Sequence, residues 1–334
     1  MIGNRKIGVL LGGLSGERDI SVRTGEAILG ALRGRGHDAT AVFVDRDIDL
    51  VLRQTHIDVA FLALHGRYGE DGCVQGLLEV LGIPYTGSGV LASALAMNKA
   101  KAKEIFRLHN LPTAPSYISE ADAGEDIIEN HGSFGFPVVV KPVGEGSSLG
   151  VRIARDELEL ESAIEDATRF DDDVIVERFI DGKEISVAVL DGKPLGAIEI
   201  VPRRGFYDFH NKYGSGRSDH HFPARLSPER YRSVLRLAAL AHGALGCEGV
   251  TRVDLIASER GNEVLLEVNT LPGLTPTSLL PRIAHGAGMS FEDLVEEILR
   301  GARLRAHGHR RDRRALQVDF SGPERRAGFM PEAH

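Results

Sequence analysis

The sequence predicts a mixed α/β and α+β fold, in which an N-terminal doubly wound parallel α/β domain precedes two α+β domains. Over residues 1–95, short apolar runs alternate with helical patterns, which is typical of a parallel sheet covered by helices. Farther along, β-rich runs follow one another across glycine-rich loops, which indicates antiparallel pairing. We expect domains over residues 1–97, 98–183 and 184–303, with a basic, mobile tail over residues 304–334.

The composition is that of an ordinary soluble globular protein. The chain has 334 residues, of which 42% are apolar and 26% charged, and this length suits two or three domains. The formal net charge is −8, but residues 301–334 carry eight Arg and four acidic side chains, so this end is +4 and the rest is −12. An acidic body argues against a nucleic-acid-binding protein, which needs a basic surface.

Targeting signals and paired cysteines are missing from the sequence. No apolar run approaches the roughly 20 residues that a membrane-spanning helix needs, so we expect no membrane partner. The N-terminal residues lead directly into a strand, without the pattern of a signal peptide. Cys73 and Cys247 lie far apart and form neither a disulfide framework nor a metal-binding spacing, so we expect two buried small hydrophobes. The sequence therefore predicts a reduced, cytoplasmic protein.

The N-terminal domain is expected to begin with a strand, a glycine-rich turn and a helix. Parallel strands are expected over residues 7–11, 39–44 and 59–64, and helices over residues 21–33 and 73–81. The turn at residues 12–17 lacks the G-x-G-x-x-G spacing of a dinucleotide site, which argues against a hydride-transfer enzyme. Its amides could hold an anion and Glu17 a cation, or it is a tight turn with a solvated carboxylate.

The two later domains are expected to consist of strands, helices and one long loop. Strands are expected over residues 136–142, 151–154 and 174–180 and from residue 184 onward, and helices over residues 100–108, 157–167, 228–245 and 291–300. Residues 203–221 are polar and are expected to form a long loop.

The loop over residues 144–150 follows a strand that ends in Lys141. In a P-loop the lysine follows the glycines and opens a helix, whereas here it precedes them and a strand follows. This order fits a β-turn-β flap whose amides close over phosphates, with Lys141 as a point charge. The alternative is a plain glycine-rich hairpin.

A second β-hairpin is predicted over residues 250–269, with its turn at residues 259–262. Strand alternation places Arg252 and Asp254 on one face of the first strand, and Glu267 and Asn269 on one face of the second. Residues between them should face a core, namely Val253, Leu255, Leu266 and Val268. Oxygen ligands on a rigid sheet suit a hard cation such as Mg²⁺. The alternative is an amphipathic hairpin whose polar face meets water.

Two weaker patterns remain open at this point. Glu177 lies on a strand along which a planar base could bind, with Glu184 near its ribose, although a core strand explains the same pattern. His65 lies in a glycine-rich segment that could equally be a plain surface loop, because a lone histidine is more often structural than catalytic.

Taken together, these segments resemble the ATP-grasp superfamily, and within it the D-alanine–D-alanine ligase family. The matching segments occur in order along the chain: LLGGLSGERDIS (10–21), ALHGRYGEDG (63–72), PYTGSG (84–89), SALAMNK (93–99), VKPVGEGSSLG (140–150), FYD (206–208), NKY (211–213) and EVNTLPGLTPTS (267–278). The resemblance implies an ATP-grasp fold in which two α+β domains clamp ATP between antiparallel sheets. It also implies two D-alanines and ATP as substrates, two Mg²⁺ (or Mn²⁺) ions, and a homodimer.

The resemblance also implies a reaction and roles for residues at its amino-acid sites. The first D-alanine attacks the γ-phosphate of ATP to form an acylphosphate, and the amino group of the second D-alanine then displaces phosphate. Glu17 would hold the first ammonium group, with His65 beside this substrate. Ser147 and Tyr213 would link Glu17 to the flap and the polar loop. Arg252 and the Gly273 amide would stabilise the oxyanion. Ser278 would bind the carboxylate of the second D-alanine.

For the nucleotide, the resemblance implies phosphate contacts from Lys99, Lys141 and Lys212. Contacts to the adenosine would come from Glu177, Phe179, Ile180 and Glu184, and the metal ligands would be Asp254, Glu267 and Asn269. A non-catalytic nucleotide-binding module would be expected to lack a metal ligand, the flap lysine or the oxyanion arginine, and this chain has all three.

Two departures from the family pattern concern substrate choice. Asn98 stands where an aspartate is common, and residues 219–221 form an unusual Asp-His-His run near the expected acceptor site. The acceptor alternatives are therefore D-serine, D-lactate or a biosynthetic amino acid, although Lys212 and Tyr213 favour an amino acid over D-lactate.

Overall fold

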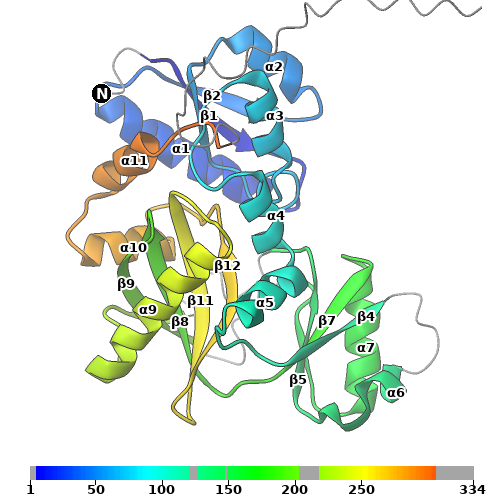
Figure 1. Cartoon of the computed structure of the whole chain (residues 1–334). Coiled ribbons are helices and arrows are strands. Elements are labelled where there is room, and N and C mark those ends of the chain that lie inside the picture. The colour runs from blue at the N-terminus through cyan, green and yellow to red at the C-terminus, as the bar shows by residue number, and fades with distance from the viewer. Residues whose placement is uncertain (1–4, 121–126, 147–148, 203–217, 306–334) are drawn as a thin grey trace, which may run out of the picture.

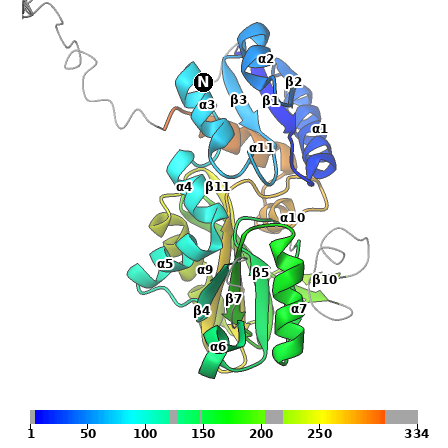
Figure 2. The same cartoon turned by 90° about the vertical axis from the view of Figure 1, so that its right-hand side faces the viewer.

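The computed structural model describes residues 5–120, 127–146, 149–202 and 218–305. One parallel sheet with its helices lies at one end of the molecule, and two antiparallel sheets lie side by side at the other (Figures 1 and 2). This arrangement confirms the predicted combination of α/β and α+β folding.

The N-terminal sheet has three parallel strands in the order β2-β1-β3, with buried apolar side chains throughout β1. Its elements are β1 (Ile7–Gly12), α1 (Arg18–Gly34), β2 (Ala39–Val44), α2 (Ile48–Thr55), β3 (Val59–Leu62), α3 (Cys73–Leu81) and α4 (Val90–Met97). Helices α2 and α4 were not predicted. Helix α2 is only eight residues long, and a segment this short offers few turns over which a helical period can be recognised.

The four-stranded antiparallel sheet has the order β4-β7-β5-β6. Its part of the chain comprises α5 (Lys99–Leu108), β4 (Ser116–Glu120), α6 (Ile127–His131), a short 3-10 turn (Gly132–Phe134), β5 (Val138–Pro142), β6 (Arg152–Ala154), α7 (Glu157–Thr168) and β7 (Asp173–Arg178). Leu160 and Ile164 of α7 pack on Val138 and Val140 of β5, so α7 covers one face of this sheet.

The five-stranded sheet has the order β10-β9-β8-β11-β12. Its elements and the helices that follow are β8 (Gly182–Leu190), β9 (Lys193–Pro202), β10 (Ser218–His221), α9 (Pro228–Ala244), β11 (Val250–Ser258), β12 (Glu263–Asn269), α10 (Leu279–Gly286) and α11 (Phe291–Arg300). The prediction of a loop over residues 203–221 was wrong at its end, because residues 218–221 pair with β9 as an edge strand. Four consecutive polar residues, Ser-Asp-His-His, lack the apolar alternation that predicts a strand.

The predicted hairpin is confirmed as β11 and β12, with one change of register. Asp254 lies opposite Glu267, but Leu255 lies opposite Leu265, so a β-bulge falls at Leu266. Leu265 is therefore fully buried and Leu266 only partly so, which corrects the prediction that Leu266 faces the core. The bulge leaves Glu267 and Asn269 on the face of the sheet that carries Arg252 and Asp254.

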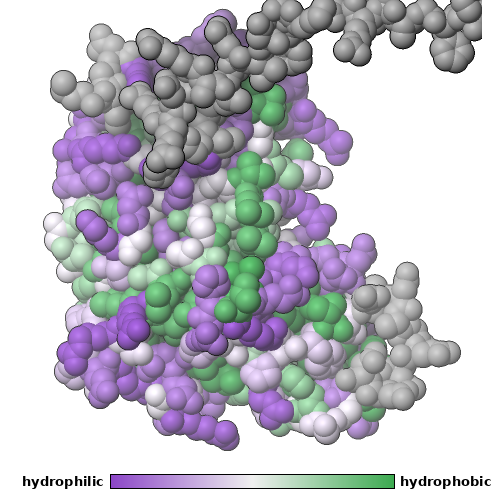
Figure 3. All heavy atoms as spheres, viewed as in Figure 1, coloured by the Kyte–Doolittle hydropathy of each residue, from purple (hydrophilic) through white to green (hydrophobic). Residues whose placement is uncertain are grey.

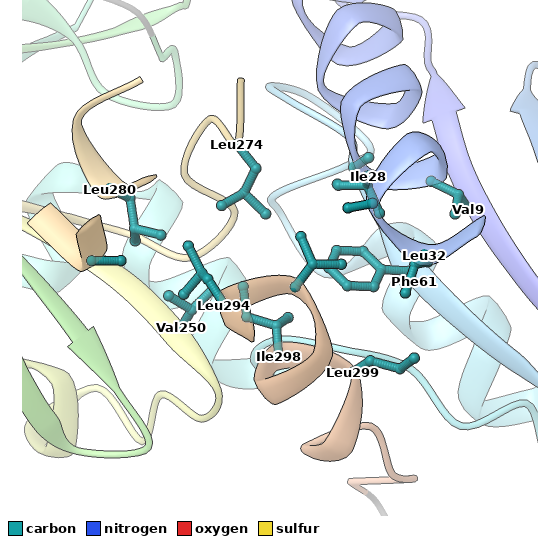
Figure 4. Close-up of a cluster of buried hydrophobic side chains, with 14 of the residues drawn as sticks. Val9, Ile28, Leu32, Phe61, Val250, Leu274, Leu280, Leu294, Ile298 and Leu299 are labelled. Atoms are coloured by element: carbon teal, nitrogen blue, oxygen red, sulfur yellow. The ribbon is translucent and has the colours of Figure 1, made fainter. Parts of the chain in front are cut away.

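The cores connect the sheets. Ile28, Phe61 and other N-terminal side chains pack against Leu294 and Ile298 of α11 (Figure 4). Phe106 of α5 packs in the core under the five-stranded sheet. Helices α5 and α11 thus each pack in a core that they share with a neighbouring predicted domain. The domain boundaries after residues 97 and 183 stay predictions.

Two smaller expectations were wrong. Arg305, which we placed in the tail, is 7% exposed at its side chain and bonds Glu248 and the Gly87 carbonyl oxygen, because the chain after α11 returns to the N-terminal domain. Cys247 is buried as expected, whereas Cys73 at the start of α3 is exposed. Among the described residues, no helix is both long and apolar enough to cross a membrane.

Candidate active site

Two adjoining cavities lie where the carboxyl ends of the N-terminal strands meet the β11–β12 hairpin. The first, of about 660 Å³, is lined by Glu17, His65, Glu70, Ala96, Met97, Lys99, Glu145, Gly146, Arg252, Glu267, Val268, Asn269, Thr270 and Gly273. The second, of about 870 Å³, is lined by Ile20, Arg23, Ser186, His220, Arg252, Asp254, Gly273, Thr275, Thr277, Ser278 and Leu279. Arg252 and Gly273 line both, so the two cavities share a wall.

Acidic side chains gather at one corner of the first cavity. Glu17 immediately precedes α1 and is 6% exposed. The ring of His65 lies between Thr24, whose Oγ1 is 3.2 Å from Nε2, and Glu70, whose Oε1 is 3.3 Å from Nδ1. Burial raises the pKa of Glu70, and the negative charge of Glu17 raises that pKa further. Two carboxyl groups in a water-poor corner suit an ammonium ligand.

Two glycines allow backbone to approach Glu17. A Cβ atom on Gly66, after β3, or on Gly146, in the flap, would lie 3.0 Å from Oε2 of Glu17. Gly66 also has φ +70°, which favours glycine. The flap and the loop after β3 therefore meet at this carboxylate.

The hairpin presents Arg252, Asp254, Glu267 and Asn269 toward the cavities. Asp254 is the cross-strand neighbour of Glu267, and Arg252 that of Asn269. Arg252 chelates Asp254: Nε lies 2.9 Å from Oδ1, and Nη2 lies 2.7 Å from Oδ2. Ser186 on β8 donates a further bond of 2.5 Å to Oδ1 of Asp254. The predicted oxyanion arginine and a predicted metal ligand are thus bonded to each other.

The oxygen atoms of this hairpin fit a magnesium ion. Asp254 and Glu267 are direct neighbours across the ladder, and the Asn269 Oδ1 accepts a single bond of 3.1 Å from the Leu271 amide. The described residues include no group of three or more His, Cys, Asp or Glu side chains suited to a metal. Two carboxylates and an amide are nonetheless a sufficient protein share for Mg²⁺, which takes its other ligands from phosphates and water.

A buried charge cluster lies beside the flap strand. Lys141 Nζ and Lys103 Nζ lie 3.0 and 3.3 Å from the same atom, Oε2 of Glu177. The two lysines lower the pKa of Glu177, although burial opposes them, and burial lowers the pKa of Lys103 to about 8. The other oxygen of Glu177, Oε1, is buried and has no hydrogen-bond partner among the residues that the structure describes.

Lys99 opens α5 directly beneath the flap. Asn98 caps this helix by accepting a 2.9 Å bond from the Lys101 amide, so the unusual residue at this position has a structural role. The Lys99 amide donates to the Val143 carbonyl oxygen, and its ammonium group bonds the Glu145 carbonyl oxygen. Lys99 thus joins the helix to the start of the glycine-rich loop.

Most of the predicted site residues converge, and some do not. The first cavity collects Glu17, His65, Lys99, Arg252, Glu267, Asn269 and Gly273, and the second adds Asp254 and Ser278. Five other predicted site residues are described by the structure but line neither cavity: Lys141, Glu177, Phe179, Ile180 and Glu184. Ser147, Lys212 and Tyr213 lie outside the described residues.

Sequence reasoning missed several polar residues here. Glu70 lies in the same glycine-rich segment as His65, which was a usable signal. Lys103 is one helical turn beyond Lys99, a spacing that places both on one face of α5. Arg23 of α1 and His220 of β10 line the second cavity, and no spacing in the sequence predicts that they meet.

Comparison with known proteins assigns the chain to a family. A family model described as D-ala D-ala ligase C-terminus matches residues 114–300, and one described as D-ala D-ala ligase N-terminus matches residues 49–88. The chain belongs to the D-alanine–D-alanine ligase family.

Relatives in this family are similar over almost their whole length. The D-alanine–D-alanine ligase of Geotalea uraniireducens is 55% identical over 301 residues, which are 90% of this chain and 96% of the relative. That of Geobacter sulfurreducens is 56% identical over 304 residues, which are 91% of this chain and 96% of the relative.

Solved structures of the family have the same fold. A crystal structure of D-alanine–D-alanine ligase from Bacillus anthracis has a TM-score of 0.81 and 37% identity, and covers 89% of this chain and 97% of that one. The same enzyme complexed with ATP has a TM-score of 0.77 and 35% identity, with the same coverage. The VanG D-Ala:D-Ser ligase from Enterococcus faecalis has a TM-score of 0.79 and 30% identity, and covers 89% and 98%. These similarities confirm the predicted fold and family.

Proposed function

We propose that this protein ligates two D-alanines to D-alanyl-D-alanine at the cost of one ATP, for the synthesis of peptidoglycan precursors. The observation that carries the proposal is the convergence in one cavity of an acidic corner, Lys99, Arg252 and two predicted metal ligands of β12. Relatives more than half identical over nine-tenths of the chain carry this activity in their names.

The first D-alanine binds with its ammonium group at Glu17. The buried carboxyl groups of Glu17 and Glu70 attract this cation, and His65 lies against Glu70. A charge-assisted hydrogen bond in a water-poor corner is stronger than one in water. The carboxylate of the substrate then lies toward Lys99 and Arg252 in the same cavity, ready to attack the γ-phosphate of ATP.

The nucleotide binds between the flap and the hairpin. Lys99 and Lys141 bind phosphate oxygens, and Lys212 would add a third contact. Glu177, Phe179, Ile180 and Glu184 border the adenosine. Asp254, Glu267 and Asn269 would hold two Mg²⁺ ions, which would supply positive charge to neutralise the phosphates. Ser147 and Tyr213, which lie outside the described residues, would help to exclude water from the acylphosphate.

The second D-alanine attacks the acyl carbon from the second cavity. Its carboxylate binds at Ser278, which precedes α10, where the first amides of the helix have no partners within the helix. Its amino group, once deprotonated, adds to the carbonyl carbon, and Arg252 and the Gly273 amide stabilise the resulting oxyanion. Such a donor is worth about 3–4 kcal/mol of barrier in other enzymes. The intermediate then releases phosphate and the dipeptide.

One alternative acceptor is favoured by a specific comparison. The VanG D-Ala:D-Ser ligase is structurally similar over 89% of this chain, so the same chemistry with D-serine is the second candidate. A panel of D-alanine, D-serine and D-lactate as acceptors, with product analysis by mass spectrometry, separates these possibilities.

Phosphate release from ATP with D-alanine as the sole amino acid tests the proposed function. We expect phosphate and D-alanyl-D-alanine in equal amounts, and the absence of both would refute the proposal. Glu267→Gln should abolish turnover without unfolding the protein, whereas Glu259→Gln in the exposed turn of the same hairpin should leave it unchanged. Mg²⁺ with ADP should raise the Tm of the wild type but not that of Glu267→Gln. Equal shifts in both proteins would contradict the metal assignment.

The oligomeric state and the cellular location belong to the same proposal. We expect a homodimer, measurable by light scattering, and a cytoplasmic location, measurable by fractionation. Exposed apolar side chains support a protein contact: Leu91 is 71% exposed on α4 and Val80 is 83% exposed on α3. An apolar strip over α4 is visible in Figure 3.

A further inference from the structure

His220 lies in the second cavity with an unused hydrogen-bonding nitrogen. It belongs to the edge strand β10, opposite Ile200 of β9, and it lines the cavity together with Ser278 and Arg23. Its Nδ1 lies 2.9 Å from Nη1 of Arg282 on α10. Its Nε2 is buried and has no hydrogen-bond partner among the described residues.

The arginine determines which nitrogen of His220 carries the proton. A guanidinium group can only donate hydrogen bonds, so Nδ1 must accept and must be unprotonated. Burial and the neighbouring charge of Arg282 also lower the pKa of His220, which favours the neutral ring. The proton of a neutral ring with an accepting Nδ1 resides on Nε2. His220 therefore offers an N–H donor, and a buried donor without a partner is costly unless a ligand accepts from it.

The cavity that His220 lines suits a carboxylate. Among the described residues, the ionised side chains that line the cavity are Arg23, Arg252 and Asp254, so their net charge is +1, and Arg252 and Asp254 already neutralise each other. Ser278, whose hydroxyl also bonds Thr275, precedes the first turn of α10, which favours negative charge. The remaining polar side chains of this described lining can all donate a hydrogen bond or carry positive charge.

We propose that His220 binds the carboxylate of the acceptor amino acid through Nε2–H, together with Ser278, and that Arg282 is the positioning residue that keeps this proton on Nε2. This inference rests on the proposed ligase function and names a residue for its acceptor site. It gives His220, the middle residue of the unusual Asp-His-His run over residues 219–221, a role in recognising an α-amino acid by its carboxylate.

Replacing His220 by leucine should raise the KM of the acceptor D-alanine about tenfold or more, because a hydrogen bond to a charged group is lost. The KM of ATP and that of the first D-alanine should change little. His220→Gln, which retains an N–H donor, should restore much of the acceptor affinity. His221→Leu is the matched control, because His221 is the next residue on the same strand, does not line the cavity, and should keep the wild-type KM. A wild-type acceptor KM in His220→Leu would overturn the proposal.

D-alaninamide identifies the group that His220 contacts. It lacks the carboxylate that ATP phosphorylates, so with D-alanine as donor it can only be an acceptor. The wild type should prefer D-alanine over D-alaninamide, and His220→Leu should lose about tenfold of that preference, while its preference between D-alanine and D-serine stays constant. An altered D-serine preference with an unchanged D-alaninamide preference would show that His220 contacts the acceptor side chain instead, and would overturn the proposal.

Arg282→Met provides an independent test that leaves His220 in place. It should raise the acceptor KM, although less than His220→Leu does. It should also lower the preference for D-alanine over D-alaninamide, as His220→Leu does. In the double variant, Arg282→Met should add nothing to the effect of His220→Leu. Additive effects of the two substitutions would refute the positioning role. If His220→Leu fails to fold, the D-alaninamide preference of Arg282→Met decides the proposal. A wild-type protein that releases no phosphate with any acceptor would refute the ligase function itself, which is a distinguishable result.

Discussion

Lys103→Met removes the central member of a buried contact between three parts of the chain. The Lys103 side chain is fully buried, lies 3.3 Å from Oε2 of Glu177 on β7, and donates a 2.8 Å bond to Thr113. Thr113 in turn donates to the Leu265 carbonyl oxygen on β12. Methionine fills a similar volume, so the substitution removes charge and hydrogen bonds without leaving a large cavity.

The expected destabilisation is about 3 kcal/mol. Breaking a buried ion pair by removing one partner costs about 3–5 kcal/mol, since the other charge is left buried without compensation. Here Glu177 keeps Lys141 at 3.0 Å, and methionine avoids the desolvation of an ammonium group, so the lower end of that range applies. A loss of this size should lower the Tm by roughly 4 °C, because the entropy of unfolding of about 2.1 cal/mol/K per residue sums to about 0.7 kcal/mol/K in a protein of this size.

Urea unfolding of Lys103→Met, followed by circular dichroism, measures this loss. Lys101→Met is the matched control, because Lys101 lies on the same helix with its side chain 57% exposed, paired only with Glu104 at the surface, and should cost below about 0.5 kcal/mol. ATP binding should also weaken in Lys103→Met, because Glu177 would then pair with Lys141 only and would hold that lysine away from the phosphates more strongly. Equal stabilities of the two variants would refute the reasoning that the buried cluster stabilises the fold.

Three further predictions concern stability. Burial lowers the pKa of Lys103 from its ordinary value of 10.5 to about 8, so the folded protein loses this proton at a lower pH than the unfolded chain. The free energy of unfolding of the wild type, compared with that of Lys103→Met, should therefore increase by roughly 2 kcal/mol between pH 8 and 9.5. A difference that stays constant over this range would contradict the lowered pKa. Gly25→Ala should destabilise by about 1–3 kcal/mol, because a Cβ would lie 2.6 Å from a side chain of β1, whereas Gly30→Ala on the same helix meets open space and should stabilise by about 0.5–1 kcal/mol; thermal denaturation of both variants tests the sign. Arg305→Ala should cost about 2 kcal/mol and Arg303→Ala below about 1 kcal/mol, because their side chains are 7% and 56% exposed; urea midpoints that rank them in the opposite order would refute the docking of Arg305.

Local patterns predicted those parts of the fold whose elements bury one regular face. The strand over residues 39–44 and the helices over residues 73–81 and 291–300 have the predicted bounds. The misses share a cause. The edge strand over residues 218–221 becomes regular only by pairing with β9, and the bulge at Leu266 is a property of two strands together. Neither is encoded in the periodicity of a single segment.

The candidate site was predictable where its residues share one element and not where they come from several. Alternation correctly predicted that Arg252 and Asp254 share a face of β11 and that Glu267 and Asn269 share a face of β12, whereas the pairing of Asp254 with Glu267 became visible only in the structure. No spacing, however, relates Lys103 on α5 to Glu177 on β7, or His220 on β10 to Arg282 on α10. Such pairs form only when sheets and helices distant in sequence pack together. The ordered motifs predicted a set of site residues, while the packing determines which of them touch.

The pairing of Arg252 with Asp254 is a contact that the sequence prediction did not include, although it placed both residues correctly. Alternation on β11 places both side chains on one face, and the same alternation brings the guanidinium within 2.7 Å of the carboxylate. A positive group therefore lies against one of the oxygen ligands expected to bind Mg²⁺. A Mg²⁺ ion at Asp254 would therefore have to compete with Arg252 for this carboxylate, and that competition would release the arginine toward the reacting carbonyl group in the neighbouring cavity.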